Sequence, residues 1–122
     1  MKDRRVLCYL RTHRRVWGLT QGELARLLGL GNASQVSRLE RCKRKRGPGI
    51  EAALACQVLF GVAPADMFPS VHRQVEERVI QSAYHMHQGL AHLTSLPALR
   101  KRELLESALK RATGKIKTLM EV

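Results

Sequence analysis

The sequence predicts an all-α protein, with short helices over residues 1–69 and a helical hairpin over residues 70–122. Aromatic residues make up only 4% of the 122-residue chain, whereas 44% of its residues are hydrophobic. A core built mainly from leucine, alanine and valine favours helix over sheet. The apolar residues also recur three or four positions apart, which is the helical period. Glycines and prolines interrupt this period where helices are expected to end.

The first two helices are expected on either side of Gly18. Leu10 and Trp17 follow helical spacing before that glycine. After it, Thr20 and Glu23 have the spacing of a capping box, in which each side chain bonds the backbone N–H of the other residue. The helix that starts there should bury three leucines and end at a glycine: Leu24, Leu27, Leu28 and Gly29.

A third helix is expected over residues 33–40, with Asn32 as its polar cap. Only Val36 and Leu39 on it are clearly apolar, so one narrow stripe should face the core. Two helices joined by a short glycine turn, the second polar on its outer face, form a helix-turn-helix pattern. The side chains left for the outside are Ser34, Gln35, Ser37 and Arg38.

The fourth helix, residues 50–60, is apolar on almost every side. A short helix of this kind is expected at the centre of its domain, and Gly61 should end it. One more helical turn fits in residues 63–69, where Pro69 closes the domain.

Two long helices are predicted for the C-terminal part. Pro97 lies near the start of the second, where its missing N–H is harmless, and Gly114 is expected to end that helix. The first extends over about 23 residues, or roughly 35 Å of helix. Its apolar residues recur three or four positions apart: Val71, Val75, Val79, Ala83, Met86, Leu90 and Leu93.

Positive charge is confined to the N-terminal part of the chain. The net charge is +12, and residues 1–49 carry 13 Lys/Arg against three Asp/Glu, a net +10. Residues 50–122 have a net charge of only +2. A basic half of this kind is expected of a surface that meets a polyanion.

The spacing of the three cysteines and the lack of a long apolar stretch predict a cytoplasmic protein. Cys8, Cys42 and Cys56 are widely spaced and include no C-x-x-C pair, so three reduced thiols are expected. No stretch approaches the ~20 apolar residues that cross a bilayer, and no signal peptide is visible. Neither membrane association nor secretion is expected.

Over residues 4–68 the chain resembles the lambda-repressor-like (Xre/Cro) helix-turn-helix family. The resemblance implies a five-helix DNA-binding domain whose second motif helix enters the major groove of duplex DNA. It implies no cofactor and extends no further than residue 68. The segments that carry it are Leu10-Arg11-x-x-Arg14, Gly18-Leu-Thr-Gln21-x-Glu-Leu-Ala25, Leu28-Gly29, Val36-Ser37-x-Leu39-Glu40 and Phe60-Gly-Val62.

The resemblance also implies that some polar residues would read bases and others would bind phosphates. Ser34, Gln35 and Arg38, with Asn32 at the rim, would read base edges, for which serine, glutamine and arginine side chains are suited. Gln21 would contact a phosphate and brace the reading helix. Phosphate contacts give affinity and register rather than sequence information. In the loop after the helix they would come from Lys43, Arg44, Lys45 and Arg46.

Two departures from the family pattern affect the ends of the reading helix. The segment Gly29–Glu40 is one residue longer than usual, so the turn at residues 30–32 must absorb the insertion. Cys42 stands where the family usually has a glycine. A non-glycine residue disfavours a left-handed cap, so the helix could continue into the basic cluster.

Other polar residues are assigned structural roles. By the resemblance, Arg14 and Glu40 form a buried ion pair between the first and third helices. His85 and His87 face different sides of a helix, so no metal site is expected there. No set of nucleophile, base and orienting group is visible, and the protein is not expected to be an enzyme.

The long C-terminal stripe has two interpretations, which are compatible. It can pack on the last helix within one subunit, or it can form a dimer seam that brings two DNA-reading helices to adjacent half-sites. The residues expected in that seam are Val75, Val79, Ala83, Met86 and Leu90.

Three functions follow from these observations. The first is a transcriptional regulator that binds double-stranded DNA as a homodimer. The second is a protein-binding module, such as an antitoxin or polymerase adaptor, whose C-terminal helices bind a partner. The third, an RNA-binding protein, ranks last because the few aromatic residues form no cluster for stacking unpaired bases.

Overall fold

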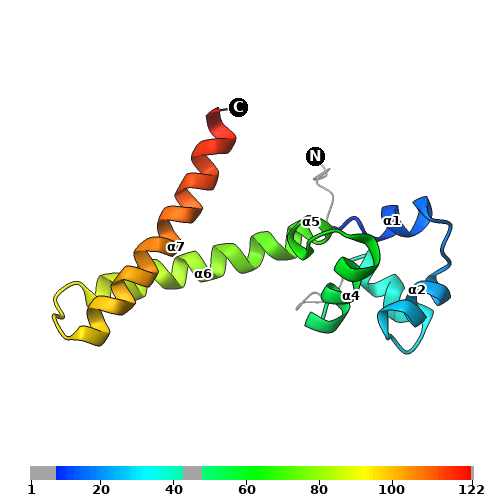
Figure 1. Cartoon of the computed structure of the whole chain (residues 1–122), viewed down its shortest axis with the longest axis horizontal. Coiled ribbons are helices and arrows are strands. Elements are labelled where there is room, and N and C mark those ends of the chain that lie inside the picture. The colour runs from blue at the N-terminus through cyan, green and yellow to red at the C-terminus, as the bar shows by residue number, and fades with distance from the viewer. Residues whose placement is uncertain (1–7, 43–47, 122) are drawn as a thin grey trace. The chain divides into compact units, whose positions relative to one another are not determined.

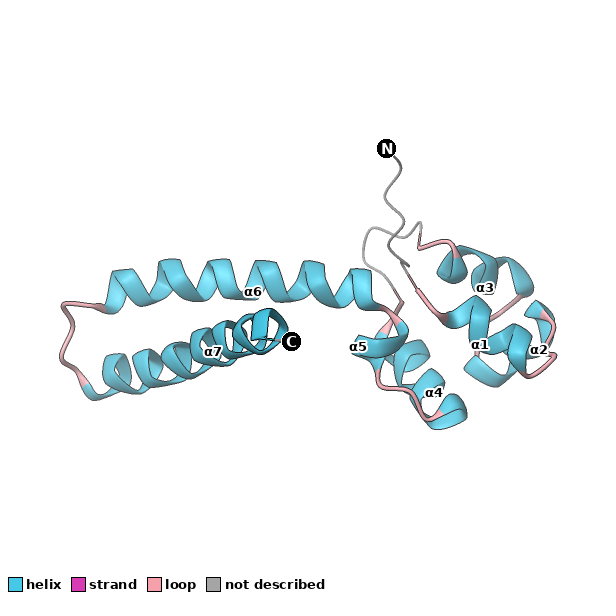
Figure 2. Cartoon of the chain, turned by 90° about the horizontal axis from the view of Figure 1, so that it is seen from above, coloured by secondary structure: helices cyan, strands magenta, loops and turns pink. Residues whose placement is uncertain are grey.

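The computed structural model describes residues 8–42 and 48–121, and every regular element in these ranges is a helix (Figures 1 and 2). The chain divides into two compact units, residues 1–74 and 75–122, so the division falls inside one long helix, α6. The helices are α1 Leu10–Val16, α2 Gln21–Leu28, α3 Ala33–Glu40, α4 Ile50–Phe60, α5 Pro64–Met67, α6 Pro69–Leu90 and α7 Leu96–Glu121.

The predicted caps of α2 are present. Thr20 Oγ1 accepts a hydrogen bond from the Glu23 backbone N–H at 3.0 Å, and Glu23 Oε1 accepts one from the Thr20 N–H at 2.9 Å. Gly29 ends the helix with a φ of 72°, in the left-handed region that glycine adopts without strain. These local bonds fix where α2 begins and ends, and therefore where the turn toward α3 starts.

The turn and cap before α3 also follow the sequence. The Leu30 backbone N–H donates to the Ala25 carbonyl at 2.8 Å, which closes the end of α2. Asn32 is extended, and its Oδ1 accepts from the Gln35 N–H at 3.2 Å, so α3 begins at Ala33. Residues 29–32 connect the two helices, and α3 has the predicted bounds.

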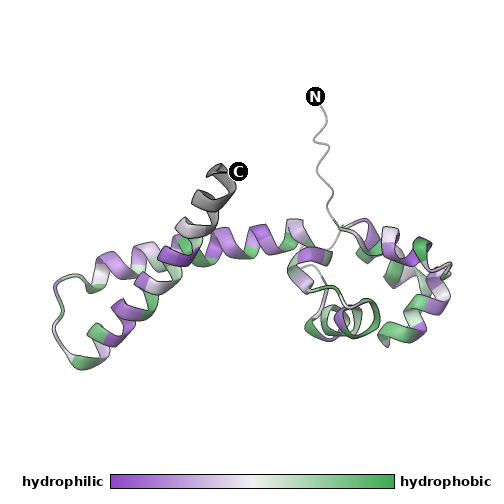
Figure 3. Cartoon of the chain, turned by 45° about the horizontal axis from the view of Figure 1, so that its top comes forward, coloured by the Kyte–Doolittle hydropathy of each residue, from purple (hydrophilic) through white to green (hydrophobic). Residues whose placement is uncertain are grey.

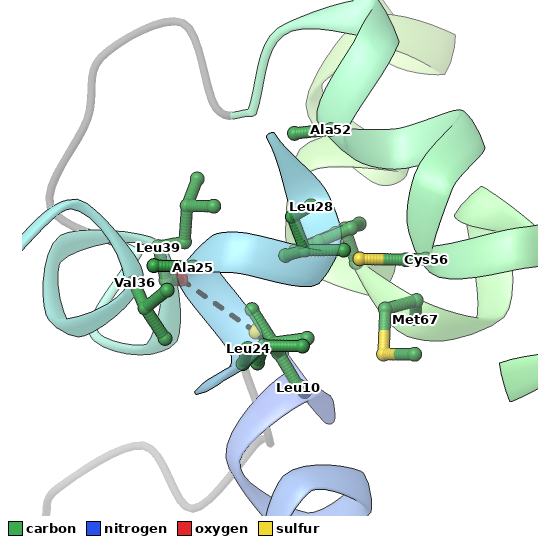
Figure 4. Packing of buried hydrophobic residues seen from close by; sticks show 11 residues of the cluster. Leu10, Leu24, Ala25, Leu28, Val36, Leu39, Ala52, Cys56 and Met67 are labelled. Carbon is green, nitrogen blue, oxygen red and sulfur yellow. Dashed lines mark hydrogen bonds between the residues drawn. The ribbon is translucent and has the colours of Figure 1, made fainter. Parts of the chain in front are cut away.

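One fully buried side chain from each of α1 to α5 forms the centre of the first unit. Around them pack half-buried residues that include Leu19, Val62 and Val71. The backbone N–H of Tyr9 donates to the Met67 carbonyl at 2.9 Å, which joins the start of α1 to α5. The five central side chains are Leu10, Leu24, Val36, Cys56 and Met67 (Figure 4).

The expectation that α4 lies at the centre of its domain is wrong. Only Ala52 and Cys56 of this helix are buried. Its other face is open to solvent, with Ile50 76%, Leu54 50% and Val58 87% exposed. Besides Ala52 and Cys56, the residues of α4 that pack against the core are Ala53, Ala55 and Phe60, all half-buried.

One smaller expectation about the core also fails. Leu27 of α2 is exposed, whereas its neighbours Leu24 and Leu28 are buried. Leu27 fits helical periodicity, but the packing of α2 against α3 and α4 leaves its side chain on the solvent side. Trp17, which follows helical spacing in α1, lies at the C-cap of that helix and is exposed.

The second unit comprises the C-terminal part of α6, a loop and α7. Hydrophilic and hydrophobic residues alternate along α6 (Figure 3), and between residues 75 and 114 only Ala83 and Ala98 are buried. His87 Nε2 lies 2.9 Å from Glu106 Oε1 and joins the two helices. This hairpin therefore has almost no apolar core of its own.

The predicted end of α7 at Gly114 is wrong, because the helix continues to Glu121. Gly114 keeps a helical backbone and has open space around it. A glycine inside a helix costs only about 1 kcal/mol relative to alanine, so it ends a helix only when the chain beyond it turns away.

Val58→Ala and Val36→Ala compare the same substitution on the exposed face of α4 and in the core. Val58→Ala is expected to change the free energy of unfolding by less than about 0.5 kcal/mol. Val36→Ala should cost about 1.5–3 kcal/mol, because it removes buried methyl groups and leaves a cavity. Urea denaturation of the two variants checks this, and similar losses would show that α4 is covered.

Candidate nucleic-acid interface

The position of α3 is set by α2, which packs directly against it. Val36 and Leu39 on the inner face of α3 are buried beside Leu24 and Ala25 of α2 (Figure 4). Because both inner residues lie on one narrow stripe, the opposite face of α3 is turned to solvent. This is the arrangement that the helix-turn-helix pattern predicts.

A carboxylate at the end of α3 joins three elements. Glu40 Oε2 accepts from Arg14 Nε at 2.6 Å, and Glu40 Oε1 accepts from Arg14 Nη2 at 3.3 Å. The side chains are only 12% and 3% exposed for Arg14 and Glu40, respectively. The expected ion pair between α1 and α3 is therefore present, and its bidentate geometry is that of a strong, oriented pair.

Two further bonds complete this group, which we call the Glu40 hub (Arg14, Leu19, Gln21 and Glu40). Gln21 Nε2 donates to Glu40 Oε1 at 3.1 Å, and Arg14 Nη1 donates to the Leu19 carbonyl at 2.9 Å. The hub thus connects α1, the loop before α2, the first residue of α2 and the last residue of α3. Gln21 braces α3 through this bond.

The four residues expected to read bases fall into two groups. Ser34 and Arg38 are exposed on the outer face of α3. Asn32 is occupied as the helix cap, and Gln35 Oε1 accepts from the Gly31 backbone N–H at 3.0 Å. A glutamine that pairs with adenine uses both its oxygen and its amide nitrogen. The Gln35 amide oxygen already uses one of its two lone pairs on the Gly31 N–H.

Arg41 is a further cation at the end of α3 that the sequence reasoning did not single out. Its guanidinium donates from Nη2 to Ser37 Oγ at 2.6 Å and from Nε to the Ser37 carbonyl at 3.3 Å. These bonds hold Arg41 along the outer surface of α3, one turn from Arg38. The i,i+4 spacing of a serine and an arginine was the available signal. Lys43, Arg44, Lys45 and Arg46 lie outside the described residues.

Helix α3 does not continue through Cys42. Helix α3 ends at Glu40, and Cys42 adopts a φ of 52°, the left-handed conformation usually left to glycine. Its Sγ donates to the Leu39 carbonyl at 3.6 Å, and the Cys8 Sγ donates to the same oxygen at 3.6 Å. The two thiols therefore join the Cys42 backbone N–H, which donates to the same carbonyl at 3.2 Å, at the end of the helix.

Burial keeps the thiols of the first unit protonated. Burial is the main cause that raises the pKa of Cys8 to about 12 and the pKa of Cys56 to about 11. It also raises the pKa of Cys42, which is less enclosed. A protonated thiol is a weak nucleophile and a poor metal ligand. No three potential metal ligands come together in the described part of the chain.

No protein-family model matches the sequence, and neither curated proteins nor solved structures include a significant match. None of the described helices combines the length and apolar character needed to span a membrane.

Glu40→Gln is expected to destabilise the first unit by about 3–5 kcal/mol, because it leaves the Arg14 guanidinium buried without its counter-charge. Glu23→Gln is the matched control, since Glu23 is an exposed carboxylate that only caps α2. Its cost should stay below about 1 kcal/mol. Chemical denaturation measures both. Equal losses would mean that the hub contributes no more than a surface cap.

Stability should fall as the pH rises above about 9, because the unfolded chain releases thiol protons that the folded chain retains. The raised pKa values of Cys8 and Cys56 stabilise the fold fully below the ordinary thiol value of 9.0, and this contribution is lost toward pH 11–12. Denaturation midpoints across this range should depend less on pH in a Cys8→Ala/Cys56→Ala variant. Parallel curves for variant and wild type would contradict the assignment.

Proposed function

We propose that this protein is a sequence-specific transcriptional regulator of the lambda-repressor-like helix-turn-helix family, with α1–α5 as its DNA-binding domain. In this proposal α3 enters the major groove, and Ser34 and Arg38 contact base edges. The observation that carries the proposal is the Glu40 hub, which fixes the end of a helix whose outer face is polar and exposed. A reading helix needs such rigid support, since base contacts depend on sub-ångström placement.

The distribution of charge supports the same function. Exposed arginines of the first unit lie on α1, α2 and at the end of α3, and residues 1–49 hold most of the excess positive charge. Cations on a polar helix and on its flanks can neutralise phosphates while the helix reads the groove. In the proposed complex, Arg41 joins Gln21 and residues 43–46 in contacting the backbone.

A second candidate, a protein-binding module, is favoured by one observation. The second unit leaves large aliphatic side chains exposed on a hairpin that buries only two alanines between residues 75 and 114. The two candidates are compatible, because a regulator with two half-sites must self-associate. The five residues expected in a dimer seam do not share one open face: Ala83 is buried and Leu90 is half-buried within the chain.

Arg38→Ala and Lys45→Ala separate reading from phosphate binding. Arg38→Ala should cost about 1–3 kcal/mol of discrimination between a selected operator and random duplex DNA. Lys45→Ala should weaken binding to both duplexes alike and lower the slope of log K against log salt by about one. Arg73→Ala, at an exposed arginine of α6 outside α1–α5, is the control expected to change neither. Fluorescence anisotropy with both duplexes at several salt concentrations measures these effects.

The proposal fails if wild-type protein shows no operator preference in binding-site selection. It also fails if affinity is flat between low and physiological salt, since a protein that neutralises six or more phosphates should show a slope of about −5 or steeper.

A further inference from the structure

The two helices of the second unit face each other along a seam with heptad-like spacing. On α6 the side chains at this seam recur at intervals of three or four, as do those on α7. All are half-buried or buried. They are Ile80, Ala83, His87 and Leu90 on α6, and Ala98, Arg102, Leu105, Leu109 and Ala112 on α7.

The residues beside the seam define two opposite faces of the hairpin. Successive helical residues are rotated by about 100°. In two antiparallel helices, the residues one position before the seam therefore lie on one side, and those one position after lie on the other. The grooves between the helices agree with this geometry: Val79, Ala108 and Arg111 line one, and Glu77, Gln81 and Tyr84 line the other.

The face before the seam, which we call the basic face, is apolar with cations beside it. Val79 is 50%, Met86 56% and Leu104 65% exposed. Lys101 and Arg111 lie on the same face, and Arg78 and Arg100 flank it one helical turn from Val75 and Leu104. The one carboxylate in its groove, Glu76, is half-buried and already engaged in an interaction.

The face after the seam, which we call the acidic face, carries the opposite charge. Among residues 75–114, Glu77, Glu103 and Glu106 lie there with a single cation, Lys110. The hydrogen bond with His87 is the main cause that lowers the pKa of Glu106, so its carboxylate stays ionised. A groove of about 540 Å³ runs along this face, lined by Glu77, Ile80, Gln81, Tyr84 and Leu109.

An isolated hairpin of this composition is poorly stabilised. The described part of the second unit buries only Ala83 and Ala98, and Arg102 Nε is buried at the seam without a hydrogen-bond partner. Helices obtain most of their stability from packing an apolar face, and exposed apolar patches rimmed by polar residues mark interaction sites. We therefore expect another surface to pack on the basic face.

We propose that the basic face of one copy packs on the acidic face of a second copy, in a head-to-tail contact. Val79, Met86 and Leu104 would cover the groove beside Tyr84, and Lys101 and Arg111 would approach Glu77 and Glu103. Packing two basic faces together instead would bring Lys101 and Arg111 of each copy into opposition, with Arg78 and Arg100 at the flanks and, among residues 75–114, no exposed carboxylate on that face to pair them. Complementary potentials favour the first arrangement and penalise the second.

A head-to-tail contact has a consequence that a two-fold dimer lacks. Each copy retains one free basic face and one free acidic face, so assembly continues past the dimer unless it closes into a ring. The proposal specifies how the proposed regulator self-associates. It is tested without DNA, so failure of the contact and failure of DNA binding are distinguishable.

Two charge-reversal variants of the full chain test the contact. Lys101→Glu/Arg111→Glu gives a hairpin with two acidic faces, and Glu77→Lys/Glu103→Lys gives one with two basic faces. Each variant alone should sediment as a monomer where the wild type associates. An equimolar mixture should recover association to within about tenfold of the wild type, because each junction again pairs opposite charges. Circular dichroism checks that both variants keep their helices.

Three results would overturn the proposal. If the wild-type protein stays monomeric at about 100 μM, a second copy does not bind the basic face, and an acidic helix of another protein would be its partner. Tighter association of Lys101→Glu/Arg111→Glu alone, with Glu77→Lys/Glu103→Lys unchanged from wild type, would indicate a two-fold dimer through the basic faces. A mixture no more associated than its components would remove the charge complementarity on which the contact depends. Variants that lose their helices are replaced by Lys101→Gln and Glu103→Gln, each expected to weaken wild-type association.

Discussion

The Glu40 carboxylate is the constraint on which the first unit depends. It receives hydrogen bonds from Arg14 and Gln21 while almost completely enclosed. A carboxylate removed from water is stabilised only if its partners are fixed, so α1, the start of α2 and the end of α3 must take one mutual arrangement. A hydrophobic contact would tolerate sliding or rotation, whereas a bidentate pair does not.

The same constraint explains how a short helix can present an ordered polar face. Helix α3 has eight residues and buries only Val36 and Leu39, too little to fix its orientation by packing alone. Asn32 caps its start, Glu40 anchors its end, and the two thiols on the Leu39 carbonyl complete the C-terminal side. Polar bonds at both ends thus replace the large apolar stripe that a longer helix would use.

The two units meet the need for burial differently. In the first, five helices each contribute a fully buried side chain, and the aliphatic side chains on the outer face of α4 are exposed to solvent. In the second, between residues 75 and 114, two long helices bury only two alanines, and their opposite faces differ in charge. The first unit is stabilised by contacts within the chain, whereas the second has surfaces whose complement we place on another copy.

The sequence by itself determined the helices and most of their ends. These ends depend on residues that are close together in the chain, so residue spacing alone specifies them. They are the capping box of Thr20 and Glu23, the cap at Asn32 and the left-handed backbone of Gly29. Gly114 failed as a helix end because a glycine permits a turn without requiring one. Only the resemblance to a known family pointed to the ion pair of Arg14 with a residue 26 positions away.

The tertiary structure alone decided which face of each helix is covered. The apolar character of α4 on almost every side predicted a central helix, yet only Ala52 and Cys56 of it are buried, while Ile50, Leu54 and Val58 are exposed. In the same way, Gln35 is tied to Gly31, and Ala83 is enclosed by the hairpin. Helical spacing predicts which residues share a face of a helix. Which face is buried depends on the neighbouring helix that packs there, and that helix comes from a distant part of the chain.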